Sequence, residues 1–272
     1  MTHRISFQGA RVLVTGAGSG LGRLLAAGAA QRGAHVIVWD LAPERAGATR
    51  DLIRSRGYVA DSAVVDVTDR AAVEVAAAAA GPVDVLINCA GVISGRALLS
   101  TTPQSIERTL AVNLNSLFWV TRAFLGGMAE RGHGVVVTVS SAAGIMGSAR
   151  MTDYAASKFG AFGFMDSLRN EMRLAHTGVR TLIVCPYFMS TGMFDGVATR
   201  IPLLMPILRP TAVAVKILNG IERGTQQLIM PPMVRTVPLL RLFPPPVLDA
   251  VADIFGINHT MDAFTGRPGD RV

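Results

Sequence analysis

The sequence is poor in cysteine, histidine and aromatic residues, and each shortage excludes a class of protein. Cys89 and Cys185 are the only cysteines among 272 residues, so a fold built on disulfides is excluded. The five histidines are scattered without a pair at ligand spacing, and we therefore expect no metal site. Half of the residues are apolar, which is enough to bury a large core without covalent links.

Lysine is also scarce, although the formal net charge is +7: only Lys158 and Lys216 accompany the arginines. Because no run of five or six basic residues appears and aromatic residues make up 6%, nucleic-acid binding is not expected. The longest stretch without a charged residue, 132–149, is rich in glycine and serine and does not read as a membrane span. The polar opening, residues 1–9, does not resemble a signal peptide, so we expect a cytoplasmic protein.

Short apolar runs alternate with amphipathic stretches over the first 190 residues. Apolar strands separated by helices indicate a parallel sheet covered on both faces, so we expect an α/β fold with a doubly wound, Rossmann-like sheet. No repeat or linker appears, and one domain is expected over residues 1–272. Strands are predicted at residues 10–15, 34–40, 58–66, 83–88, 134–140, 179–185 and 226–230, and helices at residues 21–33, 43–55, 69–79, 105–130, 153–176 and 211–223.

A glycine-rich turn, TGAGSGLG at residues 15–22, joins the first predicted strand to the first helix. Gly16 permits a tight turn, and Gly20 and Gly22 let a pyrophosphate approach the helix N-terminus, where unpaired N–H groups favour anions. A purely structural turn is the alternative. The predicted cofactor contacts in this turn are Gly16, Ser19, Gly20, Leu21 and Gly22.

Acidic residues follow the second and third predicted strands. Asp40 can accept hydrogen bonds from both ribose hydroxyls of adenosine and would repel a 2′-phosphate, which favours NAD over NADP. Ser19, Leu41 and Ala42 supply no cation for that phosphate. Asp66 and Val67 are candidates for contact with the adenine. The alternative for either aspartate is a simple cap at a strand end.

The segment YAASK, residues 154–158, begins a predicted helix and places Tyr154 and Lys158 four residues apart on one helical face. A compact ammonium can hold ribose hydroxyls and lower the pKa of a neighbouring phenol. Tyr154 would then take a proton from an alcohol, or donate one to a ketone in the reverse direction. At the end of the fifth predicted strand Ser141 is placed to bond the substrate oxygen, with Ser140 as its competitor.

These motifs, in this order, resemble the short-chain dehydrogenase/reductase family over nearly the whole chain. The resemblance selects Ser141 over Ser140, because the family's serine precedes the tyrosine by thirteen positions. It implies that Asn113 holds a water near the lysine and that Thr191, five residues after Pro186, bonds the nicotinamide carboxamide. It also adds Asn88, Ala90 and Gly91 to the cofactor contacts. Cys89 and Tyr187 depart from the family pattern, and Tyr187 either shapes the pocket or packs under the substrate loop.

A finer resemblance rests on CPYFMSTGMFDG (185–196) and the ending MDAFTGRPG (261–269). Both are similar to a branch that includes retinol dehydrogenases and 17β-hydroxysteroid dehydrogenase relatives, which implies a bulky apolar alcohol or ketone. Residues 187–256 would form an irregular substrate lid, with packing on the sheet or on a subunit as the alternative. The family implies a homodimer or homotetramer through the helices at 105–130 and 153–176. Apolar residues beside Arg235 and Arg241 suggest peripheral contact with a membrane.

Three functions remain open at this point. The first is an NAD-dependent dehydrogenase that oxidises a primary or secondary alcohol, and the second is a ketone or acyl reductase that uses the same residues. The third is a non-catalytic NAD-binding regulator. The complete set of Asn113, Ser141, Tyr154 and Lys158 argues against a regulator.

Overall fold

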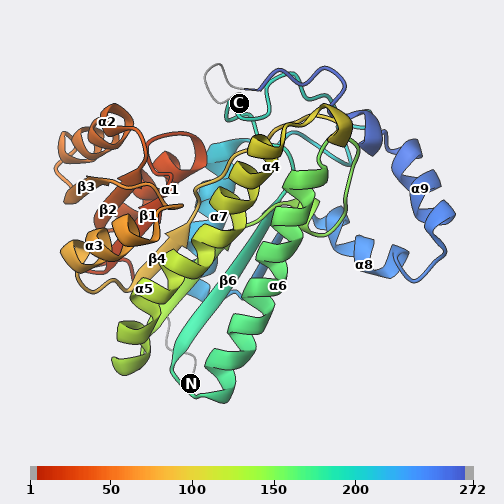
Figure 1. Cartoon of the computed structure of the whole chain (residues 1–272). Helices are drawn as coiled ribbons and strands as arrows, with labels where there is room; N and C mark the ends of the chain where they lie inside the picture. Colours follow the sequence, from red (N-terminus) through yellow and green to blue (C-terminus); the bar gives the residue numbers. More distant parts are fainter. Residues whose placement is uncertain (1–4, 267–272) are drawn as a thin grey trace.

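A computed structural model describes residues 5–266 and contains one seven-stranded sheet between two layers of helices (Figure 1). Every neighbouring pair of strands is parallel, in the order β3-β2-β1-β4-β5-β6-β7. The predicted α/β, doubly wound fold is thus confirmed. The strands are β1 (Arg11–Thr15), β2 (His35–Asp40), β3 (Ala60–Val64), β4 (Val85–Asn88), β5 (Gly134–Val139), β6 (Val179–Pro186) and β7 (Gln227–Met230).

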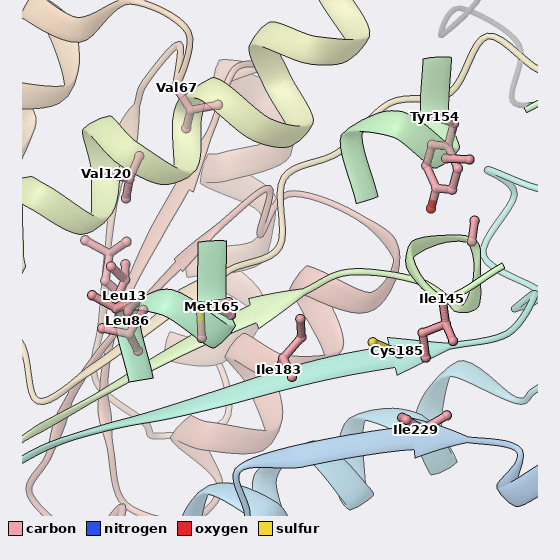
Figure 2. Close-up of a cluster of buried hydrophobic side chains, with 14 of the residues drawn as sticks. Leu13, Val67, Leu86, Val120, Ile145, Tyr154, Met165, Ile183, Cys185 and Ile229 are labelled. Carbon is pink, nitrogen blue, oxygen red and sulfur yellow. The ribbon is translucent and has the colours of Figure 1, made fainter. Parts of the chain in front are cut away.

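Successive residues of each strand point to opposite faces of the sheet, and each face packs against one layer of helices. On β1, Leu13 belongs to one buried cluster, together with residues of α3, α5 and α6, while Val12 and Val14 belong to the other, together with residues of α1, α2 and α7. Figure 2 shows Leu13 and Leu86 beside Val120 in the first cluster. The helices are α1 (Gly20–Ala30), α2 (Pro43–Arg54), α3 (Arg70–Ala80), α4 (Pro103–Leu110), α5 (Ser116–Glu130), α6 (Thr152–Leu174), α7 (Pro210–Arg223), α8 (Val237–Leu240) and α9 (Pro245–Ile254).

The chain order reverses direction across the sheet between β1 and β4, and loops from both sides gather at the carboxyl ends of these strands. Ligands of such folds bind at this switch point. The Thr15 hydroxyl oxygen accepts hydrogen bonds from the backbone N–H groups of Cys89 (3.0 Å) and Ala90 (3.2 Å). This side chain therefore ties the end of β1 to the loop after β4.

Two segments differ from the sequence predictions. The single helix predicted over residues 105–130 is α4 and α5, joined by a π-helical turn, Ala111–Asn115, that contains Asn113. Residues 233–256, expected to be irregular, contain the short helices α8 and α9, which project from the body of the molecule (Figure 1). Residues 267–269 of the C-terminal signature lie outside the described residues. Within residues 5–266, no helix has the length and apolar character needed to cross a membrane.

Candidate active site

A cleft of about 570 Å³ lies at the carboxyl ends of the strands. It brings together residues that are up to 178 positions apart, from Gly16 to Phe194. Nearly all the residues that the sequence analysis selected line this one cleft. They are Gly16, Ser19, Gly20, Leu21, Gly22, Asp40, Asp66, Val67, Ala90, Gly91, Ser141, Tyr154, Lys158, Pro186 and Thr191.

The turn between β1 and α1 has no room for a side chain at Gly16 or Gly22. Gly16 has a φ of +64°, and a Cβ atom there would lie 2.8 Å from the Ala90 Cα. A Cβ atom on Gly22 would clash with the Gly16 carbonyl. The N-terminus of α1 faces this cradle without an acidic residue in its first turn, which suits an anionic group. These residues fit a dinucleotide pyrophosphate, whereas residues 5–266 contain no cluster of three His, Cys, Asp or Glu side chains able to hold a metal ion.

Asp40 is buried at the end of β2, where each of its carboxylate oxygens accepts one backbone N–H. Oδ2 accepts from Gly18 (2.8 Å) and Oδ1 from Ala42 (3.0 Å). An ionised carboxylate offers about four acceptor positions, so capacity remains for ribose hydroxyls. At the end of β3, Asp66 accepts from the backbone N–H (2.9 Å) and hydroxyl (2.7 Å) of Thr68.

Arg45 is a cleft residue that the sequence analysis missed. It lies on the first turn of α2, exposed and in the wall of the cleft that also contains Asp40. A Cβ atom built on Gly18 would lie 2.6 Å from the Asp40 carboxylate and 2.7 Å from the Arg45 Cβ, so the two residues are neighbours. The signal was available, because the first turn of a helix after β2 points back to the strand end. A basic residue therefore lines the same wall of the cleft as Asp40.

Tyr154 and Lys158 lie on the first two turns of α6, and both are buried. The Lys158 Nζ is 5.6 Å from the centre of the Tyr154 ring and donates a hydrogen bond to the Val139 carbonyl (3.1 Å). An ammonium has three donors, so two remain for a ligand. The Tyr154 hydroxyl points from α6 toward the carboxyl end of β6 (Figure 2).

Burial shifts both groups of this pair toward their neutral forms. The pKa of Tyr154 rises to about 12, because burial outweighs the hydrogen bond from Ser141 that lowers it. The pKa of Lys158 falls to about 8, also through burial. The sequence analysis expected Lys158 to lower the phenol pKa, but in the protein without a cofactor burial dominates and the pKa rises. A positive charge from a bound ligand would lower the pKa of Tyr154 and so favour its action as a base.

The neighbouring serines Ser140 and Ser141 have different partners. The Ser140 hydroxyl is buried and donates a hydrogen bond to the Lys158 backbone carbonyl (2.9 Å), which fastens α6 to the end of β5. The Ser141 oxygen accepts from the Ala143 N–H (3.1 Å), and its side chain hydrogen-bonds to Tyr154. Ser141 is therefore the serine placed beside the tyrosine.

Two residues selected from the sequence do not line the cleft. The Asn88 amide donates to the Thr121 hydroxyl on α5 (3.2 Å). The Asn113 oxygen accepts from the Val92 N–H (2.8 Å), while its nitrogen donates to the Val92 carbonyl (2.9 Å) and the Ser157 hydroxyl (3.0 Å). Both amides are thus engaged in holding strands, loops and helices together. The π-helical turn at Asn113 is a feature often found at functional sites.

A second cavity, of about 70 Å³, lies behind the first and is mostly apolar. Ser141, Tyr187 and Phe194 line both spaces, so the two cavities adjoin at these three side chains. The far wall comes from the C-terminal part of the chain, including Leu240 of α8 and Val251 of α9. We call this second cavity the apolar chamber.

Comparison with known proteins gives consistent results. Residues 10–201 match the family model described as short chain dehydrogenase. The chain is 40% identical over 268 residues to the Bos taurus short-chain dehydrogenase/reductase family 16C member 6, covering 94% of this chain and 83% of that protein. It is 38% identical over 276 residues to the Mus musculus epidermal retinol dehydrogenase 2, covering 97% of this chain and 88% of the relative. A Burkholderia phymatum short-chain dehydrogenase/reductase crystallised with NAD superposes with a TM-score of 0.80 at 26% identity, covering 88% and 95% of the two chains.

Proposed function

The chain belongs to the short-chain dehydrogenase family and is a nicotinamide-dependent oxidoreductase. From this premise we propose that it uses NAD to interconvert an apolar alcohol and its aldehyde or ketone. One observation carries the proposal. A single cleft holds both a cradle that only glycine allows, at Gly16 and Gly22, and the buried pair Tyr154 and Lys158. A dinucleotide bound in the cradle would extend toward the proton-transfer groups.

Bound NAD supplies the acceptor for the hydride that leaves the alcohol carbon. Tyr154 takes the alcohol proton, and Ser141 hydrogen-bonds the same substrate oxygen while lowering the tyrosine pKa. Lys158 donates to ribose hydroxyls with the donors that Val139 does not use. We assign Thr191 and Pro186 to the carboxamide end of the cofactor. The side-chain amide of Asn113 is already hydrogen-bonded to Val92 and Ser157. We therefore assign the backbone carbonyl of Asn113 as the acceptor that holds a water near Lys158.

Asp40 supports NAD as the cofactor. Its carboxylate is fixed by two backbone N–H groups and lies where a 2′-phosphate would have to sit. Two negative charges at close range in a partly dry site repel strongly. Arg45 reduces this repulsion without removing it, since the carboxylate and not the guanidinium is buried.

The apolar chamber supports a substrate with an apolar body. It opens beside Ser141 and is lined by flexible methionines, Met146, Met205 and Met233 among them, which adapt to irregular ligands. Two of the mammalian relatives at 38% identity are named epidermal retinol dehydrogenase 2. We therefore propose retinoids, long-chain alcohols or hydroxysteroids as the substrate class, with residues 187–256 as the lid over it.

Reduction of a ketone or aldehyde is a second candidate, favoured by the tyrosine pKa. Burial raises the pKa of Tyr154 to about 12 in the protein alone, a direction that suits a proton donor. The same side chains serve both directions by reversal of each step. The nucleotide supplied and its redox state would decide which direction dominates.

Assembly and location are further parts of the proposal. The outer surface of α5 and α6 carries Phe118, which is 47% exposed and packs against Phe164 at 4.8 Å between ring centres. We assign a homodimer or homotetramer contact to these helices. Around α8 and α9 four large apolar side chains are more than half exposed: Leu239, Leu242, Phe243 and Ile254. With Arg235 and Arg241 nearby, this surface suits peripheral contact with a lipid membrane.

The direct test is formation of NADH across a panel of retinol, hydroxysteroids and fatty alcohols, with the Tyr154→Phe variant as control. We expect NADH from the wild type with at least one class and none above background from the variant. Equal rates in the two proteins, or no turnover of any alcohol or of the matching carbonyl with NADH, would refute the proposed function.

A further inference from the structure

Four aromatic side chains form a continuous row that starts at the catalytic tyrosine. Tyr154 packs edge-on against Phe194 at 6.0 Å, Phe194 against Phe188 at 5.1 Å, and Phe188 against Tyr187 at 4.7 Å between ring centres. Edge-to-face contacts of this kind are a favoured geometry for aromatic rings. Tyr154 comes from α6, and the other three come from the loop after β6.

The row stands at the boundary between the two cavities. Tyr154 lines only the cofactor cleft and Phe188 only the apolar chamber, whereas Tyr187 and Phe194 line both. An apolar substrate whose carbinol carbon reaches Tyr154 must therefore pass beside Phe194. The chamber measures about 70 Å³, while pockets for drug-sized ligands measure about 300–1,000 Å³. Part of the chamber wall must therefore move before a retinoid-sized body can enter, and Phe194 belongs to that wall.

Phe194 is the member of the row that has freedom to move. Tyr154, Tyr187 and Phe188 are at most 8% exposed, whereas Phe194 is only partly buried. We propose that Phe194 is a specificity-determining gate. Without substrate its ring covers Tyr154, and with substrate the ring turns aside and packs against the apolar body next to the carbinol carbon. This inference rests on the proposed function and adds a selection against alcohols that are branched near that carbon.

The backbone that carries Phe194 is held by the end of the chain. Residues 260–266, which we call the C-terminal strap, donate two hydrogen bonds to the Asp195 carbonyl, from the N–H groups of Thr265 (2.8 Å) and Gly266 (3.2 Å). Gly196 has a φ of +85°, and a Cβ atom there would clash with the Ala263 carbonyl of the strap. The strap therefore fixes the backbone beside the gate, and only the Phe194 side chain needs to turn.

The gate is tested by comparing catalytic efficiency, kcat/KM with NAD, for decan-1-ol and for cyclododecanol, which is branched at its carbinol carbon. We expect Phe194→Ala to raise the cyclododecanol:decanol ratio at least tenfold and Phe194→Trp to lower it, with the Kd of NAD within twofold of wild type. Gly196→Ala should raise the ratio by a smaller factor, because it pushes the loop off the strap. Gly132→Ala is the matched control, since Gly132 also has a positive φ (+72°) but faces open space.

An unchanged ratio in a folded, NAD-binding Phe194→Ala protein would overturn the gate. A wild type that turns over neither any alcohol with NAD nor the matching carbonyl with NADH would instead refute the proposed function. In that case retinol fluorescence titration tests the gate without turnover. We expect at least fivefold tighter retinol binding to Phe194→Ala, because no ring has to be displaced from Tyr154. Equal affinity, or no binding to either protein, would overturn the gate as well.

Discussion

At the catalytic tyrosine, burial and hydrogen bonding act on the pKa in opposite directions. Burial stabilises the neutral phenol, and the Ser141 hydrogen bond stabilises the phenolate. Alcohol oxidation needs the phenolate, so its kcat/KM should rise with pH as Tyr154 loses its proton. The reverse reaction needs the phenol and should fall over the same range.

Ser141→Ala should shift this alkaline rise to higher pH, because it removes the interaction that lowers the tyrosine pKa. A hydrogen bond to a charged group contributes about 1.5–3 kcal/mol, which corresponds to a shift on the order of one pH unit. The measurement is the pH profile of kcat/KM for oxidation. Ser140→Ala is the control, since that hydroxyl bonds the Lys158 carbonyl and should leave the profile in place. Equal shifts in both variants would contradict the distinction between the serines.

Asp40 and Arg45 make opposite contributions to the choice of cofactor. We expect Asp40→Ser to bring the NAD:NADP ratio of kcat/KM down by at least tenfold, because the repulsion is lost while Arg45 remains to bind a 2′-phosphate. The double variant Asp40→Ser/Arg45→Ala should lose much of the gained NADP activity. A wild type that prefers NADP would show the assignment of Asp40 to be wrong.

At the scale of elements, the sequence predicts most helices and strands, and the exceptions have physical causes. The π-helical turn Ala111–Asn115 was not predicted, because it differs from an α-helix by one inserted residue and has no sequence signal of its own. The bonds of Asn113 to Val92 and Ser157 accompany that turn, and they join segments distant in sequence. In α8 and α9 the prolines lie at helix starts, where proline is tolerated, so they did not exclude helices there.

The projecting pair α8 and α9 should be the part of the protein that contacts lipid. We expect the wild type to co-sediment with anionic vesicles at low salt. The double variant Leu242→Asp/Phe243→Asp should bind the vesicles at least tenfold more weakly, because burial of each apolar side chain contributes about 1.5–3 kcal/mol of free energy. Leu174→Asp is the matched control, because Leu174 is 67% exposed at the far end of α6. Wild-type protein that stays in the supernatant would contradict membrane contact.

At the scale of the whole molecule, the cofactor half of the site is readable from local patterns and the substrate half is not. Gly16 follows a strand, Asp40 ends one, and Tyr154 and Lys158 lie on the first two turns of a helix, so position along the chain predicts where they meet. The apolar chamber combines residues from Ser141 to Thr260, and its shape depends on packing between loops that no periodicity describes. Arg45 was missed although it lies on the first turn of the helix that directly follows β2 and Asp40.

The central claim is that this protein moves a hydride from an alcohol carbon to NAD while Tyr154 takes the proton. Incubation with NAD and 1,1-dideuterated decan-1-ol or retinol deuterated at the carbinol carbon, followed by mass spectrometry of the nucleotide, tests it most directly. The account predicts one deuterium in the reduced cofactor from the wild type, and none from Tyr154→Phe although that variant still binds NAD. Reduced cofactor without deuterium, or equal labelling by Tyr154→Phe, would contradict it.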